Sequence, residues 1–78
     1  MIPVKFEEAN IVYGKKQPDY IPLPGHISAD GNAATFCFEL TDEEIKTLVE
    51  TKQIWLSLLT FGKPLQPIRL STIKSELL

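Results

Sequence analysis

The run Ile54–Phe61, which reads IWLSLLTF, is the only long segment of the chain that is apolar on both alternating faces. In an extended strand, even-numbered and odd-numbered side chains point to opposite sides. The apolar residues are Ile54, Leu56 and Leu58 on one face and Trp55, Leu59 and Phe61 on the other. This pattern is typical of a strand covered on both sides. It therefore predicts a central strand with both faces buried and Trp55 shielded from water.

The segment before this run carries the signals of a helix start. Thr41 is predicted to be the N-cap, and Glu44, three residues later, completes a capping box. Asp42 and Glu43 join Glu44 in the first turn, where the helix dipole favours negative charge. An apolar stripe follows at Ile45, Leu48 and Val49. We expect a helix over residues 42–51 that docks this stripe on a sheet, because a helix this short needs tertiary support.

Three other segments have strand patterns. Residues 3–13 are rich in β-branched and aromatic side chains, but the alternation changes phase, which predicts a bulge or break near residues 8–10. Residues 33–40 alternate cleanly, with Phe36, Phe38 and Leu40 on the predicted core face and Cys37 on the other. Residues 68–74 are interpreted as a last strand, paired as a hairpin with 54–61.

These elements predict one domain, residues 1–78, with an α+β fold. We expect a four- to five-stranded, mixed or mostly antiparallel sheet with one short helix, about 42–51, packed on one face. If strands 33–40 and 54–61 are adjacent, the intervening helix is long enough for a parallel, right-handed crossover. A small closed or half-closed barrel is the alternative architecture.

Charge and cysteine usage narrow the possible functions. The net charge is −2 and the eight Lys and Arg residues are scattered, so nucleic-acid binding is disfavoured. Cys37 is the single cysteine, which excludes an internal disulfide and favours a reducing compartment. No apolar run reaches the roughly 18 residues of a membrane span, and the first residues do not resemble a signal peptide. We expect a soluble, unprocessed, cytoplasmic protein.

No residue pattern predicts catalysis. The acidic triplet 42–44 is explained by helix capping rather than by paired catalytic carboxylates or a cation site. Cys37 and His26 lack the paired spacings of a zinc site and the third group of a catalytic triad. Neither glycine fingerprint of nucleotide-binding loops is present. We therefore expect a protein that is not an enzyme and that holds no metal or cofactor.

Two proline-rich segments, 17–25 and 62–67, are predicted to be loops, because proline fixes φ and pushes the preceding residue into an extended conformation. Both keep apolar side chains. These side chains are interpreted either as lids over a small core or as an exposed patch that a partner protein covers. The candidate binding residues are Tyr20, Ile21, Leu23, Leu65 and Gln66.

The segments QPDYIPLP (17–24) and IWLSLLTFGKPLQP (54–67) resemble a family of small uncharacterised proteins encoded by bacteriophages and prophages. The resemblance covers most of the chain in order. Phe38 stands where that family would have a tryptophan, and the helix is more acidic than the family pattern. The resemblance implies a phage-type protein in the cytoplasm of a bacterial host, with no known activity, so it transfers no site residue.

Three functions follow as hypotheses. The first is a phage-type accessory protein that binds a host or phage protein. The second is a structural, virion-associated or homo-oligomeric protein. The third, which the residues support least, is an enzyme or a small-ligand or nucleotide-binding protein.

Overall fold

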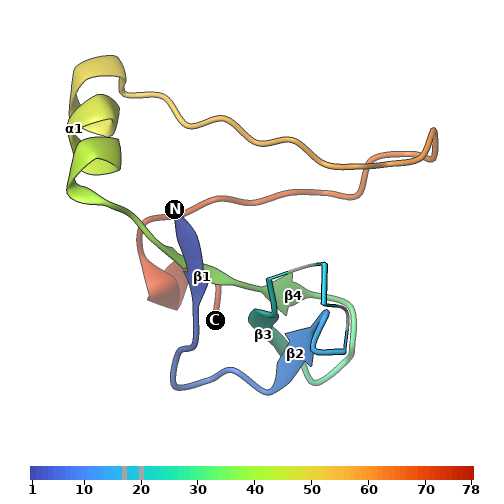
Figure 1. Cartoon of the computed structure of the whole chain (residues 1–78). Helices are drawn as coiled ribbons and strands as arrows, with labels where there is room; N and C mark the ends of the chain where they lie inside the picture. Colours follow the sequence, from blue (N-terminus) through green and yellow to red (C-terminus); the bar gives the residue numbers. More distant parts are fainter. Residues whose placement is uncertain (17, 20) are drawn as a thin grey trace.

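The computed structural model describes residues 1–16, 18–19 and 21–78. These residues form an α+β fold in which five short strands lie in two antiparallel sheets and one helix follows them (Figure 1). The elements are β1 (Ile2–Val4), β2 (Ile11–Tyr13), β3 (Leu23–Ile27), β4 (Ala34–Thr35), β5 (Cys37–Glu39), α1 (Asp42–Thr51) and the 3-10 turn η1 (Lys74–Glu76). The predicted fold class is confirmed, and the sheets stay separate rather than closing into the alternative barrel.

The segment 34–39 connects the two sheets. Its first half, β4, pairs with β3 in the sheet β2-β3-β4, and its second half, β5, pairs with β1 in the other sheet. The predicted strand 33–40 is therefore extended but interrupted at Phe36, because its two halves have different partners. All these pairings are antiparallel.

The predicted break near residues 8–10 is confirmed, since it separates β1 from β2. Asn10 stands at the end of this break and extends the β2-β3 pairing. Its side-chain amide accepts a hydrogen bond from Ile27 N–H (2.8 Å) and donates one to the Ile27 carbonyl (3.1 Å). Its backbone N–H donates to the Gly25 carbonyl (2.9 Å). The Asn10 side chain thus acts as an additional peptide group opposite β3.

Asn10→Ala should therefore lower the free energy of unfolding by about 0.5–1.5 kcal/mol, because two hydrogen bonds to the β3 backbone are lost. Urea titration at a fixed chain concentration measures this change. Asn10→Asp keeps the acceptor for Ile27 N–H and should recover part of the loss. Equal stability of the alanine variant and the native chain would contradict a bracing role for Asn10.

The best shielded point of the sheets is Gly25, the only described residue that is buried. It lies opposite Ile11 in the β2-β3 pair. The ring of Phe36 covers it, since a Cβ built at position 25 would lie 2.5 and 2.7 Å from two carbons of that ring. Tyr13 packs against Phe36 with the ring centroids 5.8 Å apart. Phe36, which separates β4 from β5, thus covers the one buried point of the described sheets.

Strand β3 includes residues that the proline content assigns to a loop. Leu23–Gly25 pair with β2, whereas His26 and Ile27 pair with β4. Pro24 consequently has a neighbouring strand on one side only, where a missing N–H is tolerated. The prediction of a loop over residues 17–25 is therefore wrong for residues 23–25.

Helix α1 begins and ends at the predicted residues, Asp42 and Thr51. The capping box is present: Thr41 Oγ1 accepts from Glu44 N–H (3.1 Å) and Glu44 Oε1 accepts from Thr41 N–H (2.9 Å). Lys52, in the left-handed conformation, ends the helix by donating its N–H to the Leu48 carbonyl (2.7 Å).

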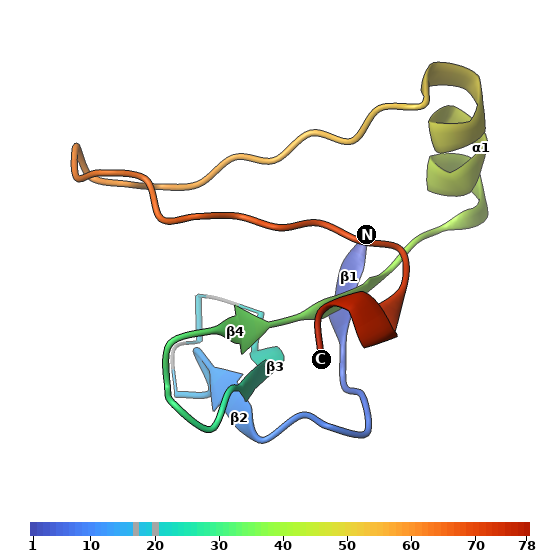
Figure 2. The ribbon, with the colours of Figure 1, turned by 180° about the vertical axis from the view of Figure 1, so that it is seen from behind.

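The apolar stripe of α1 is largely uncovered. Ile45 and Val49 are exposed and Leu48 is half-buried. The helix lies beyond the end of β5, away from the three-stranded sheet (Figures 1 and 2). The expected docking of this stripe on the sheet is not seen, because the strand that was to bring the sheet beneath it does not form.

Residues 54–61 and 68–74 form no strand, and the prediction of two strands there is wrong; residue 61 lies in a turn and residue 74 begins η1. Residues 54–61 also have no strand neighbour, so the predicted crossover from 33–40 is absent. The segment returns to the body at η1, where Lys74 Nζ pairs with the Glu8 carboxylate (3.1 Å). This hydrogen-bonded ammonium lowers the pKa of Glu8. No helix within the described residues is long and apolar enough to cross a membrane.

Candidate functional site

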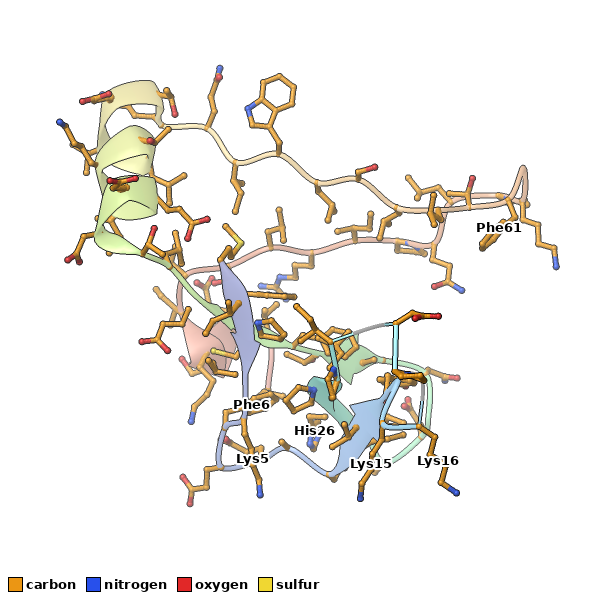
Figure 3. All side chains as sticks on the ribbon, in the orientation of Figure 1. Lys5, Phe6, Lys15, Lys16, His26 and Phe61 are labelled. Carbon is orange, nitrogen blue, oxygen red and sulfur yellow. The ribbon has the colours of Figure 1, made fainter. Side chains whose placement is uncertain are left out.

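The most unusual feature of the molecule is an extended projection, residues 53–73, here called the arm. It leaves the end of α1, runs outward to a turn and returns to η1 (Figures 1 and 2). The outgoing segment is 53–60 and the returning segment is 63–73. Phe61 lies at the far end of the arm (Figure 3).

The arm exposes large apolar side chains, and its two faces differ. Trp55, Leu59 and Phe61 are 83–88% exposed, whereas Ile54, Leu56 and Leu58 are 48–54% exposed. The period-two pattern of the sequence is thus real, but the odd-numbered face lies bare in water. The predictions that this segment is buried on both faces and that Trp55 is shielded are wrong.

The turn at the tip has hairpin geometry. Lys63 N–H donates to the Thr60 carbonyl (2.9 Å), and both central residues have positive φ, 53° at Phe61 and 76° at Gly62. Two positive φ values are required in type I′ turns, whose twist matches that of antiparallel strands. Gly62 adopts this conformation without strain, but an aromatic residue at positive φ is a strained outlier. The chain thus presents the Phe61 ring at the tip at a cost in backbone energy.

The backbone of the arm is largely unpaired. Apart from the bond at the turn, no backbone hydrogen bond joins the outgoing and returning segments, all of whose residues are described. Residues 54–60 contain no proline, so every residue there offers both an N–H donor and a carbonyl acceptor. The returning segment contains Pro64 and Pro67, which offer no donor. The outgoing segment is therefore the one suited to strand pairing.

An open hollow lies between α1 and the start of the arm. Its volume is about 430 Å³ and its lining is mainly apolar. Leu40, Leu48, Gln53, Ile54 and Trp55 are among its lining residues. The hollow and the arm adjoin, because Ile54 and Trp55 belong to both, and the lining of the hollow also includes Glu43 and Glu44.

The predicted binding residues do not form one patch. Leu65 and Gln66 are exposed on the returning segment of the arm, where Leu65 is 63% exposed. Ile21 is 74% exposed in the connection between β2 and β3, and Leu23 is half-buried in β3. Tyr20 lies outside the described residues. Residues 21–25 and the second proline-rich segment, 62–67, occupy separate parts of the molecule in both views (Figures 1 and 2).

The other chemically notable side chains have local roles. His26 Nδ1 is hydrogen-bonded to the Glu8 carbonyl (2.7 Å), and Cys37 is an exposed free thiol. Across the described part of the chain, no group of three or more His, Cys, Asp or Glu side chains could hold a metal ion.

Glu44, in the first turn of α1, has two partners for its carboxylate. Its carboxylate accepts hydrogen bonds from the ammonium group of Met1 and from Thr41 N–H. These interactions, the ammonium first, lower the pKa of Glu44 below its ordinary value of 4.5. A lowered pKa means that the ionised carboxylate stabilises the fold above pH 4.5 and that this contribution is lost as the pH falls through the folded-state pKa.

Glu44→Gln should therefore lower the melting temperature more at about pH 6 than at about pH 3, because the native carboxyl takes up a proton as the pH falls through its lowered folded-state pKa. The glutamine keeps an oxygen acceptor for Thr41 N–H, so the comparison isolates the charge. Circular dichroism at 222 nm at both pH values gives the two differences. A pH-independent difference would show that the ionised form has no special partner.

Sequence reasoning found the residues of the arm but assigned them to the core. The missed residues are those of the bare face, Trp55, Leu59 and Phe61, and their signal was the apolarity of both faces of one segment. No protein-family model, curated protein or solved structure matches this chain.

Proposed function

We propose that this chain is a non-enzymatic binding protein that attaches to another protein chain through the arm. The observation that carries the proposal is the bare apolar surface of the outgoing segment and the tip, where Trp55, Leu59 and Phe61 lie almost fully in water. Contiguous exposed apolar surface of this kind marks interaction sites in folded proteins. The unpaired backbone of the same segment adds the hydrogen-bonding groups that strand addition uses.

A phage-type accessory role in a bacterial cytoplasm is the setting that we propose. It rests on the resemblance of segments 17–24 and 54–67 to small phage and prophage proteins. The second of these segments coincides with most of the arm. The family-like residues thus fall on the surface that we assign to binding, and a host or phage protein is the partner class.

Two of the candidate binding residues, Leu65 and Gln66, lie on the returning segment of the arm and so belong to the proposed binding surface. Ile21 and Leu23 belong to a separate loop and strand, so they are a second candidate surface, whereas Tyr20 lies outside the described residues. Two charge substitutions compare the surfaces. Leu65→Glu and Ile21→Glu place the same charge at exposed apolar positions, one on the arm and one away from it.

The experiment is affinity capture in which the purified, tagged chain is the bait. The untagged chain is included among the proteins offered for capture, and mass spectrometry identifies what is bound. We expect Leu65→Glu to lose a captured protein that the native chain and Ile21→Glu both retain, with little change in melting temperature. Loss in Ile21→Glu alone would move the binding surface to the β2-β3 connection. Identical capture by all three proteins would contradict binding through either surface.

A further inference from the structure

We infer that the protein that covers the arm is a second copy of this chain, paired antiparallel through residues 54–60. The inference rests on the proposed function and names its partner. Three observations carry it: the excess surface of the single chain, the pattern of the outgoing segment and the position of the hollow at the base of the arm.

The single chain exposes far more surface than a folded monomer of its mass. Its accessible area is 7212 Å² for 8.8 kDa, whereas a compact monomer of that mass exposes about 4,800 Å². Its radius of gyration is 14.0 Å, against about 11.5 Å for a compact domain of this length. The excess area is about 2,400 Å² per chain, or about 4,800 Å² for two chains, which is the size of an obligate homodimer interface.

The described residues of the single chain form no buried apolar core. None of its described large apolar side chains is buried, although the sequence is 44% hydrophobic. Obligate homodimers lack a stable folded monomer because the core forms only between chains. A second copy would supply the apolar surface that a core needs, since each chain exposes the apolar stripe of α1 and the apolar side chains of the arm.

The outgoing segment is self-complementary about Ser57. In a two-fold symmetric pair, residue i of one chain lies opposite residue j of the other, and j lies opposite i. With Ser57 on the axis, Leu56 lies opposite Leu58, and Trp55 lies opposite Leu59. Leu56, Leu58, Trp55 and Leu59 thus each meet an apolar residue, whereas Ile54 meets Thr60 and Phe61 meets Gln53. No charged side chain occurs in 54–61 to oppose such pairing.

The same register places Phe61 of one chain opposite Gln53 of the other, which lines the hollow beside α1. In this arrangement the strained turn at the tip presents the Phe61 ring of one chain to Leu48 and Ile54 of the other, which line the hollow. Two such insertions, one at each end of the paired segments, bring each Phe61 ring to the hollow that Trp55 of the other chain also lines.

Trp55 is the only tryptophan, so its fluorescence reports on the arm alone. Light scattering and sedimentation at micromolar concentration should give a mass of about 17.6 kDa, twice the chain mass of 8.8 kDa. Trp55 emission should be blue-shifted at these concentrations and move to longer wavelength on dilution. Deuterium exchange of residues 53–61 should be slow in the dimer.

Two variants and a matched control test the interface. Leu59→Glu and Phe61→Asn should each weaken self-association by about 30-fold or more, the effect of losing one interfacial hot spot. Phe61→Asn creates the Asn-Gly pair that type I′ turns favour, so its effect cannot come from a disrupted tip. Val12→Glu, a charge at an exposed apolar residue of β2 outside the arm, should leave the mass and the emission unchanged.

A cross-link tests the register. Ser57→Cys in a Cys37→Ser chain should form an intermolecular disulfide under mild oxidation, because opposite residues of antiparallel strands lie within disulfide reach. Ser71→Cys, on the returning segment, is the control and should stay reduced. A dimer in which position 57 does not cross-link would overturn the pairing about Ser57.

The outcomes separate this inference from the proposed function. A monomeric native chain that captures another protein in an arm-dependent way would overturn the second-copy inference and leave the proposed function standing. A monomer with blue-shifted Trp55 emission would overturn both, because the arm would then pack on its own chain. A dimer that persists in Leu59→Glu and Phe61→Asn would overturn the arm as its interface.

Discussion

Gly25→Ala should lower the free energy of unfolding by about 1–3 kcal/mol, the usual penalty for overpacking a dense site. The new methyl group would lie 2.5 Å from one ring carbon of Phe36 and 3.2 Å from the Thr35 carbonyl oxygen. The backbone oxygen is fixed by the β3-β4 pairing, so the ring has to move. Urea unfolding at a fixed chain concentration measures the loss.

The cause is tested by giving the methyl group room. Phe36→Leu removes ring atoms, so in the Gly25→Ala/Phe36→Leu chain the alanine should cost much less than it does alone. A double-mutant cycle reports this coupling directly. Additive losses would show that position 25 and the ring do not compete for the same space.

Thr41→Ala should cost about 0.5–2 kcal/mol, because Glu44 N–H loses its acceptor at the start of α1. The helix has no covered apolar face to compensate, since Ile45 and Val49 are exposed. The capping box therefore contributes a large part of the stability of α1. We expect a lower helical signal at 222 nm together with a lower melting temperature.

Thr41→Ser is the matched control for this prediction. Serine keeps the hydroxyl that accepts from Glu44 N–H and should retain most of the stability. If serine and alanine at position 41 behaved alike, the hydroxyl would not be the group that matters. The prediction would then fail even with a helix at the observed position.

The elements that depend on local chemistry were predictable. The bounds of α1 follow from Thr41, Glu44 and the acidic first turn, which act over four residues. The break between β1 and β2 follows from the change of phase near residues 8–10. In both cases the groups that decide the structure lie close together in the sequence.

The elements that depend on the choice of partner were not predictable. A period-two apolar pattern in 54–61 indicates that both faces favour an apolar environment, but it does not say which chain supplies that environment. Similarly, the alternation of 33–40 gives no sign that the segment changes partner at Phe36. Pro24 is tolerated in β3 because no strand pairs with it on its second side, and the sequence does not reveal which side of a strand is unpaired.

The two prolines of the returning segment limit how many further chains could add to the proposed dimer of arms. An extended hairpin with two free edges would be a template for endless strand addition, and fibres are the usual outcome. Pro64 and Pro67 interrupt the donors on one side, so a newcomer finds a continuous edge only on the outgoing segment. Once two outgoing segments have paired, the second edge of each faces the returning segment of its own arm, which carries the two prolines (Figures 1 and 2). The positions of two prolines would thus make the difference between a closed particle and a filament.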